Sequence, residues 1–181
     1  MDYKATSSLA LNGGTIKDAA LNNATLTLAS PGATNSLGDN KALIVDTTVP
    51  TVTNVTSTTS DGSYKQGETI AITVVFSETV SVTGTPQLTL ETGGSDAVVN
   101  YSSGTGSNTL TFNYTIGSGE TSSDLDYVAT NSLALNSGTI KDASGNAATL
   151  TLASPGATNS CLLYTSPSPR DTALSRMPSS A

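Results

Sequence analysis

One segment of this chain occurs twice. Residues 2–36 recur 124 positions later as residues 126–160, and only six of the 35 aligned pairs differ. The match ends at Ser160, because the first copy continues as LGDNKALIVD up to Asp46 and the second does not. A period of this length exceeds that of solenoid repeats and suits a string of small independent domains. We expect residues 1–46 to be the C-terminal part of one repeat, and residues 47–160 to be the next repeat without its last strand.

Residues 161–181 differ in composition from the rest of the chain. They hold both arginines, the only cysteine and three of the seven prolines. The run CLLYTSPSPRD from Cys161 resembles the conceptual translation of a transposase-type sequencing adapter, and SRMPSSA at the end resembles the outer part of the same adapter. The alternative is a natural tail rich in Ser and Pro. We expect a disordered, adapter-derived tail that is not a domain, and we leave it out of the fold prediction.

Apolar and polar residues alternate through much of residues 47–160. Alternation with a period of two indicates strands with one buried face, and the abundant Thr between the apolar positions suits a half-exposed pleated surface. About seven such runs, separated by Gly-rich turns, predict an all-β antiparallel sandwich. The only weak helical pattern lies at residues 141–148. The apolar positions expected to share a buried face within each strand are Ile70, Ile72, Val74 and Phe76; Val80 and Val82; Leu88 and Leu90; Val99 and Tyr101; Leu110, Phe112, Tyr114 and Ile116; Val52 and Val55; and, in the first copy, Ala42 and Ile44.

Composition excludes several classes of function. The chain has no His and no Trp, and its 14 acidic residues outnumber its seven basic ones, for a net charge of −7. Without His, the common general base and the common nitrogen ligand for metals are missing, so we expect no enzyme activity. The acidic balance argues against a nucleic-acid surface. The chain contains no run of 18 apolar residues, so we expect no membrane span in this fragment.

Four segments of the chain, taken in order, resemble those of a known family. They are DTTVPTV from Asp46, GETIAITVVFSETV from Gly67, GTPQLTL from Gly84 and GTIKDASGN from Gly138. The bacterial immunoglobulin-like and cadherin-like tandem repeats of giant surface adhesins are similar to these segments. The resemblance implies an immunoglobulin-like sandwich, an extracellular or cell-surface location in a secreted bacterial protein, and a structural or spacer role in adhesion. Partners would be neighbouring repeats of the same chain, and surface glycans or other cells; some relatives bind calcium at repeat junctions.

Three acidic residues form the candidate metal site. Calcium prefers oxygen ligands. Because the second strand of a sandwich runs antiparallel to the first, Glu78 at the end of its strand is expected beside Asp46, and a turn at Asp142 could reach the same end. We therefore predict a calcium site at Asp46, Glu78 and Asp142, with Asp124 and Asp126 as weaker candidates. The alternatives are a self-sufficient Asp142–Asn146 turn and a solvated Glu78.

The alternative function is a carbohydrate- or polymer-binding sandwich. Exposed aromatic side chains gathered on one face would indicate it, and Tyr64, Tyr101, Tyr114 and Tyr127 are the candidates. Spaced tyrosines in a sandwich more often pack in the core or across strands. Near-identity of neighbouring copies favours the spacer, which needs only repetition.

Overall fold

A computed structural model describes residues 1–160 of the chain. The chain divides into two compact units, Met1–Asp46 and a second that starts at Thr47. The expected disordered tail at residues 161–181 lies outside the described residues. Within residues 1–160, no helix has both the length and the apolar character needed to cross a membrane.

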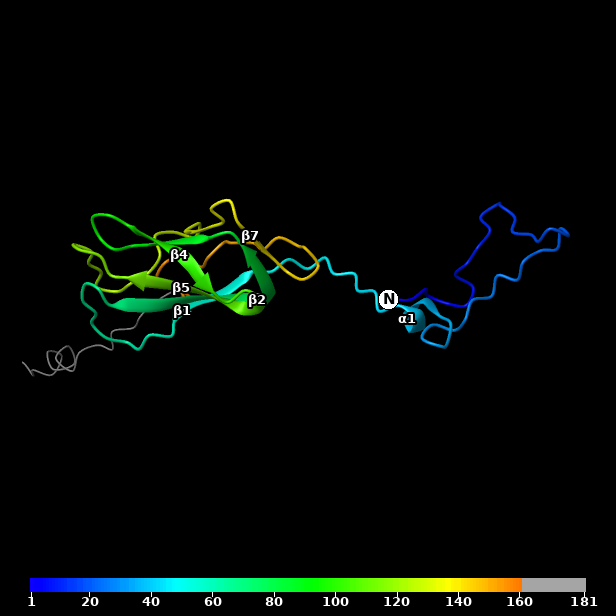
Figure 1. Cartoon of the computed structure of the whole chain (residues 1–181), viewed down its shortest axis with the longest axis horizontal. Helices are drawn as coiled ribbons and strands as arrows, with labels where there is room; N and C mark the ends of the chain where they lie inside the picture. The colour runs from blue at the N-terminus through cyan, green and yellow to red at the C-terminus, as the bar shows by residue number, and fades with distance from the viewer. Residues whose placement is uncertain (161–181) are drawn as a thin grey trace, which may run out of the picture. The chain divides into compact units, whose positions relative to one another are not determined.

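The second unit is built from antiparallel strands, which confirms the predicted fold class (Figure 1). About a third of residues 1–160, 32%, is strand and only 2% is helix. The residues 141–148 form a turn flanked by short bridges, without a helix. The strands are β1 (Val52–Ser57), β2 (Thr69–Thr83), β3 (Gln87–Leu90), β4 (Ala97–Ser103), β5 (Ser107–Thr115), β6 (Leu133–Ala134) and β7 (Thr139–Lys141).

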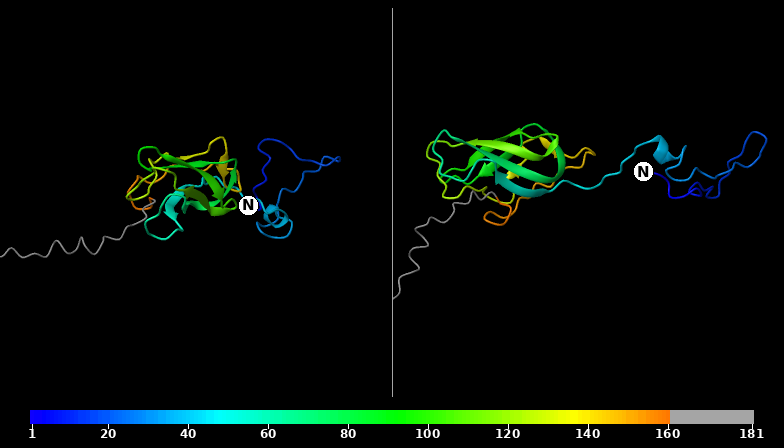
Figure 2. Two further views of the ribbon diagram at one scale, coloured as in Figure 1. Left: turned by 60° about the vertical axis from the view of Figure 1, so that its left-hand side comes forward. Right: turned by 90° about the horizontal axis from the view of Figure 1, so that it is seen from below.

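One curled sheet forms the sandwich. Its strand order is β1-β2-β5-β4-β3-β6, with β7 added on β2. The first half of β2 pairs with β1 and β5, and its last three residues pair with β7. The separate runs expected at Thr69–Phe76 and Val80–Val82 are therefore one strand of 15 residues, with a shift of register between Val75 and Val80. This irregularity lets one strand serve two parts of the sheet, which curls round a common interior (Figure 2).

The interior contains the side chains that the alternation predicted. A single buried cluster contains at least one of the predicted apolar side chains from each strand of the second unit for which the sequence predicted them. The predicted side chains that are only partly buried against this cluster are Val52, Val82, Tyr101 and Ile116. Full burial of one such side chain contributes roughly 1.5–3 kcal/mol. Among residues 1–160, no buried side-chain nitrogen or oxygen lacks a hydrogen-bond partner. The cluster is Val55, Ile70, Ile72, Val74, Phe76, Val80, Leu88, Leu90, Val99, Leu110, Phe112, Tyr114, Leu125, Tyr127, Leu133, Ile140 and Leu152.

The first unit has little regular structure. It contains one helical turn, α1 (Leu37–Asn40), which Ser36 caps by accepting a hydrogen bond from the N–H of Asp39, and an isolated bridge between Lys17 and Asn23. The strand expected at Ala42 and Ile44 is not formed, and Ile44 is 88% exposed. Because a strand needs partners for its backbone groups, a run of alternating residues without a neighbouring strand does not become one.

Candidate metal centre

The three acids named from the sequence lie together. One carboxylate oxygen each from Asp46, Glu78 and Asp142 can be chosen so that all three lie within 4.8 Å of one another. Asp142 is buried, and Asp46 and Glu78 are partly buried. Such a group of oxygen atoms is of the kind that hard divalent cations bind.

Glu78 occupies a different part of its strand from the one expected. The sequence placed it at a strand end, which is wrong: it lies inside β2, in the irregular stretch between Val75 and Val80. There, the backbone N–H of Ser77 donates to the carbonyl of Thr51 at 2.8 Å, and the N–H of Thr51 donates to the Ser77 hydroxyl at 3.1 Å. These two bonds hold the chain that follows Asp46 against the residue next to Glu78.

Asp142 reaches the same place through β7. Lys141, its neighbour, pairs with Ser81 of β2, three residues beyond Glu78. The end of β7 therefore delivers Asp142 to the irregular part of β2. Glu78 thus lies in β2, and Asp142 follows a strand that pairs with β2.

The carboxylate of Asp142 also organises its own turn. Its Oδ1 accepts the backbone N–H groups of Ser144 at 2.9 Å and Asn146 at 2.8 Å, and its Oδ2 accepts the Asn146 side-chain amide at 2.7 Å. Burial acts to raise the pKa of Asp142, but the hydrogen bonds from Asn146, Ser144 and Gly145 outweigh it and lower the pKa overall. Asp142 therefore carries a negative charge at neutral pH.

The Asp142–Asn146 turn, which the sequence offered as the alternative to a metal site, forms, and the group of three acids forms as well. Gly145 has the left-handed backbone that such a turn uses, with φ of 92°. Each carboxylate oxygen has two lone-pair directions, so Oδ2, with one hydrogen bond shown, keeps acceptor capacity for a cation. The turn and cation binding by Asp142 are chemically compatible.

The acidic group suits a divalent cation. A bound divalent ion offsets repulsion between carboxylates that lie close together. Calcium takes six to eight oxygen ligands, so three carboxylates supply part of its shell, and backbone carbonyls or waters would supply the rest. The donor set of carboxylate oxygens fits calcium better than it fits a softer transition metal.

The weaker candidates lie elsewhere in the second unit. Asp126 is buried and accepts the backbone N–H of Tyr127 at 2.8 Å and that of Gly156 at 2.9 Å, so it joins two loops. Asp124 borders a separate cavity. Neither belongs to the acidic group at Asp46, Glu78 and Asp142.

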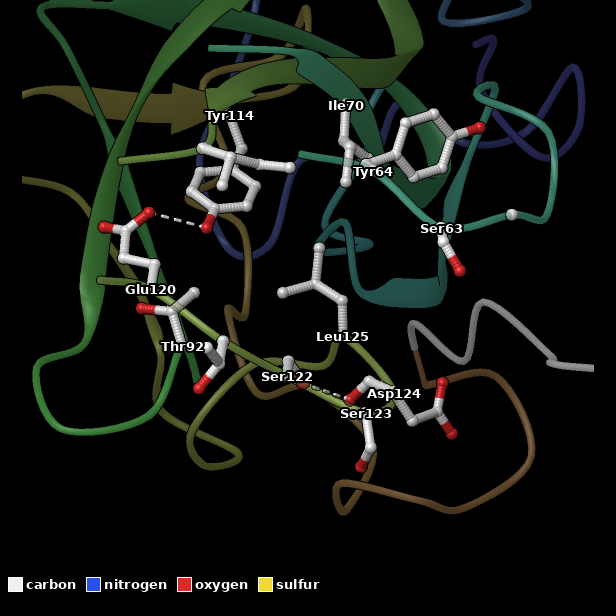
Figure 3. A pocket seen from close by; sticks show the side chains of 13 residues that line it. Ser63, Tyr64, Ile70, Thr92, Tyr114, Glu120, Ser122, Ser123, Asp124 and Leu125 are labelled. Carbon is white, nitrogen blue, oxygen red and sulfur yellow. Dashed lines mark hydrogen bonds between the residues drawn. The ribbon is translucent and has the colours of Figure 1, made fainter. Parts of the chain in front are cut away.

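That cavity was not predicted from the sequence. It has a volume of about 290 Å³ and is bordered by Tyr64, Ile70, Tyr114, Glu120 and Leu125, among others (Figure 3). The Tyr114 hydroxyl donates to Oε2 of Glu120 at 2.7 Å, and the N–H of Gly117 donates to the same oxygen at 2.6 Å. Burial and then the Glu120 carboxylate raise the pKa of Tyr114. The sequence GSGE from Gly117 predicts a turn, but it does not predict that Glu120 in this turn would accept a hydrogen bond from Tyr114.

The tyrosines do not gather on an exposed face. Tyr114 and Tyr127 are buried in the core, and the Tyr127 hydroxyl donates to the carbonyl of Ala153 at 2.7 Å. Tyr101 packs edge-on against Phe112, with ring centroids 6.1 Å apart. These three tyrosines therefore pack in the core or across strands, which was the alternative to a sugar-binding face. Of the four candidate tyrosines, Tyr64 and Tyr114 border the cavity.

Comparison with known proteins gives this chain no relative. It matches no protein-family model, no curated protein and no solved structure. Functional argument therefore rests on the repeated segment and on the geometry described above.

Proposed function

We propose that this chain is a structural, spacer-type repeat region of a large secreted or cell-surface adhesin. The observation that carries the proposal is the repetition of one segment, residues 2–36, as residues 126–160. A chain that extends and spaces needs the same module many times, whereas a binding or catalytic module has no such need.

Repetition extends to atomic detail. In each copy the first aspartate, Asp2 or Asp126, accepts the N–H of the following tyrosine and that of a glycine 30 residues on. In each copy the tyrosine hydroxyl donates to a carbonyl 26 residues on, at 2.6 Å from Tyr3 and 2.7 Å from Tyr127. The two copies thus share these local hydrogen bonds, as expected for modules that are copied in series.

Chemical composition supports an extracellular address. Residues 1–160 contain no cysteine, so they present no thiol to oxidants outside the cell. Their acidic character keeps a long array soluble and self-repelling. Partners in this proposal are neighbouring repeats and, through other parts of the adhesin, surface glycans or other cells.

Calcium bound by Asp46, Glu78 and Asp142 would give this module its stiffness. Asp46 immediately precedes the second unit, whose first strand begins at Val52, and the other two acids lie on the body of that unit. A cation held by all three would fix the entry of the chain into the sandwich. The proposed role of the metal is mechanical, because it adds a cross-link without a reaction.

Thermal melting of the whole chain with calcium or with a chelator tests the metal. Calcium at a hundred times its dissociation constant would stabilise the folded state by about 2.7 kcal/mol and raise the midpoint accordingly. Glu78→Gln should abolish the rise, because the amide keeps the shape and loses the charge. The matched control is Glu91→Gln, an exposed acid outside the group, which should respond to calcium as the unmodified chain does. An equal midpoint with calcium and with chelator would remove the metal from the proposal.

The cavity beside Tyr64 and Tyr114 favours one rival function, the binding of carbohydrate. It combines two aromatic rings with the carboxylate of Glu120, a mixture that sugar sites use. A glycan array probed with the whole chain separates the two proposals. The spacer role predicts no selective signal, and a selective sugar signal that is lost in Tyr64→Ala would favour the binding module.

A further inference from the structure

The cavity beside Tyr64 and Tyr114 is built within the body of the second unit. All of the described residues that border it lie between Gly62 and Leu125. They come from the loop before β2, the start of β2, the end of β5 and the segment that follows β5. Its volume of about 290 Å³ lies at the lower end of the range of roughly 300–1,000 Å³ that is usual for small-molecule pockets. The cavity therefore suits a ligand group of a few heavy atoms.

The charged side chains at this cavity are acidic. Glu120 and Asp124 border it, and none of the described residues that border it is a lysine or an arginine. The whole chain carries a net charge of −7. A hollow bordered by charges of one sign concentrates ions of the opposite sign, so this cavity attracts cations and repels anions.

The carboxylate of Glu120 is held in place before any ligand arrives. Its Oε2 accepts the Tyr114 hydroxyl at 2.7 Å and the backbone N–H of Gly117 at 2.6 Å. Both bonds fall on the same oxygen, so Oε1 keeps acceptor capacity for a ligand. A group that is already fixed loses less conformational entropy when it binds than a mobile one.

The loop that carries Glu120 is also tied to its surroundings. The N–H of Thr121 donates to the carbonyl of Thr92 at 2.9 Å, and the Ser122 hydroxyl donates to the carbonyl of Asp124 at 2.8 Å (Figure 3). The hydroxyls of Ser63, Ser122 and Ser123 at the wall offer further acceptors. The wall is thus a preformed set of oxygen atoms around one carboxylate.

The remaining wall is aromatic and aliphatic. The rings of Tyr64 and Tyr114 border the cavity together with Ile70 and Leu125. Both rings are anchored through their hydroxyls, that of Tyr64 to the carbonyl of Ser60 and that of Tyr114 to Glu120. The faces of aromatic rings attract cations, and aliphatic side chains cover the apolar part of a ligand.

We propose that this cavity binds a primary alkylammonium ion, with Glu120 as its counter-ion. The three N–H groups of such an ion need acceptors, which Oε1 of Glu120 and the serine hydroxyls supply, and its alkyl stem packs against Ile70 and Leu125. A neutral sugar would leave the charge of Glu120 unmatched, so the ammonium ion is favoured over it. This inference goes beyond the spacer role, and it does not depend on calcium.

Two probes of equal shape test the proposal in the whole, unmodified chain. n-Butylammonium chloride and n-butanol differ in charge and in N–H donors, and they share the alkyl stem. Each is titrated at the same ionic strength and pH 7, and the backbone amide resonances of Gly117 and Thr121 are followed by NMR. We expect saturable shifts with n-butylammonium, and an affinity at least five-fold weaker for n-butanol.

Two variants locate the contact. Glu120→Gln keeps an oxygen that accepts from Tyr114 and Gly117 and loses the charge, so it should weaken n-butylammonium at least five-fold. Tyr64→Leu keeps an apolar side chain and loses the ring, so it should weaken n-butylammonium and leave n-butanol unchanged. The matched control is Glu91→Gln, an exposed acid that does not border the cavity, which should bind as the unmodified chain does.

Several results would overturn the proposal. They are equal affinity for n-butylammonium and n-butanol, the absence of saturable shifts at Gly117 and Thr121, and an equal loss of affinity in Glu91→Gln and Glu120→Gln. Tighter binding of glucose than of n-butylammonium would assign the cavity to a neutral sugar instead. The comparison of probes in the unmodified chain decides the matter even where a variant does not fold.

Discussion

Asp142 carries two tasks with one carboxylate. It closes the turn after β7 by accepting three hydrogen bonds from Ser144 and Asn146, and it contributes an oxygen to the group with Asp46 and Glu78. Its counterpart Asp18 closes the same kind of turn in the first unit. The turn is therefore a local property of the sequence, and the acidic group is a property of the fold.

Acid should weaken the second unit through Asp142. The pKa of this carboxyl is lowered in the folded state, so its contribution is complete above the unfolded value of about 3.9 and is lost as the pH falls through the lower folded value. Asp142→Asn should therefore be less stable than the unmodified chain near pH 7 and should approach its stability near pH 2. Urea unfolding across this range, with the exposed Asp61→Asn as control for net charge, measures the difference. A gap that stays constant with pH would contradict this assignment.

At the residue scale the sequence predicted what is local. An aspartate followed by a glycine and an asparagine favours a capped turn, and that turn forms at Asp142. Leu21, in the same position of the first copy as Gly145, also adopts the left-handed backbone, with φ of 67°. This could not be predicted, because leucine disfavours that conformation and only the surrounding hydrogen bonds to Asp18 enforce it.

At the scale of elements, β2 organises the second unit. It pairs with β1, β5 and β7, and its irregular stretch holds Glu78. The sequence predicted both apolar runs of this strand but not their continuity. Ser77, Glu78 and Thr79 interrupt the alternation, and their place in the strand is fixed by bonds to Thr51, a residue 26 positions from Ser77. Periodicity carries no information about such distant partners.

Close approach of β2 and β7 gives a prediction at this scale. A Cβ added at Gly138 would lie 2.3 Å from the carbonyl oxygen of Thr83, so Gly138→Ala should push the two strands apart and cost about 1–3 kcal/mol. Gly14→Ala is the matched control in the first copy, where the nearest atom is the Leu11 carbonyl oxygen at 3.2 Å. Thermal melting should show a lower midpoint for Gly138→Ala only. Equal midpoints for both variants would mean that the β2 and β7 contact is dispensable.

At the scale of the whole molecule, one sequence adopts two environments. Ile140→Ala removes a fully buried side chain and should cost about 2–5 kcal/mol, whereas Ile16→Ala alters an exposed one and should cost almost nothing. Denaturant unfolding of the two variants at low concentration measures both values under identical conditions. A similar loss from Ile16→Ala would show that the first unit is packed against a partner in solution.

The alternation of apolar and polar residues predicted the core of the second unit, but it did not predict that the apolar side chains of the first unit are exposed. Leu9 and Leu133 sit in the same local sequence, so no local rule distinguishes them. Their burial is decided by whether β3 lies beside them, and β3 pairs with Leu133. The antiparallel order of the first two strands was enough to predict Glu78 near Asp46, whereas the place of Asp142 depends on the pairing of β7 with β2, which the sequence did not predict.

The lateness of β6 and β7 in the chain has a consequence for biosynthesis. A ribosome that adds about 5–20 residues per second completes β3 several seconds before it delivers Ile140. During that interval the edge of β2 and β3 that β6 and β7 later cover has no partner strand from its own repeat. Synthesis of each module therefore passes through a stage in which a sheet edge is open to pairing with other chains, and that stage ends only when residues 133–141 have been made.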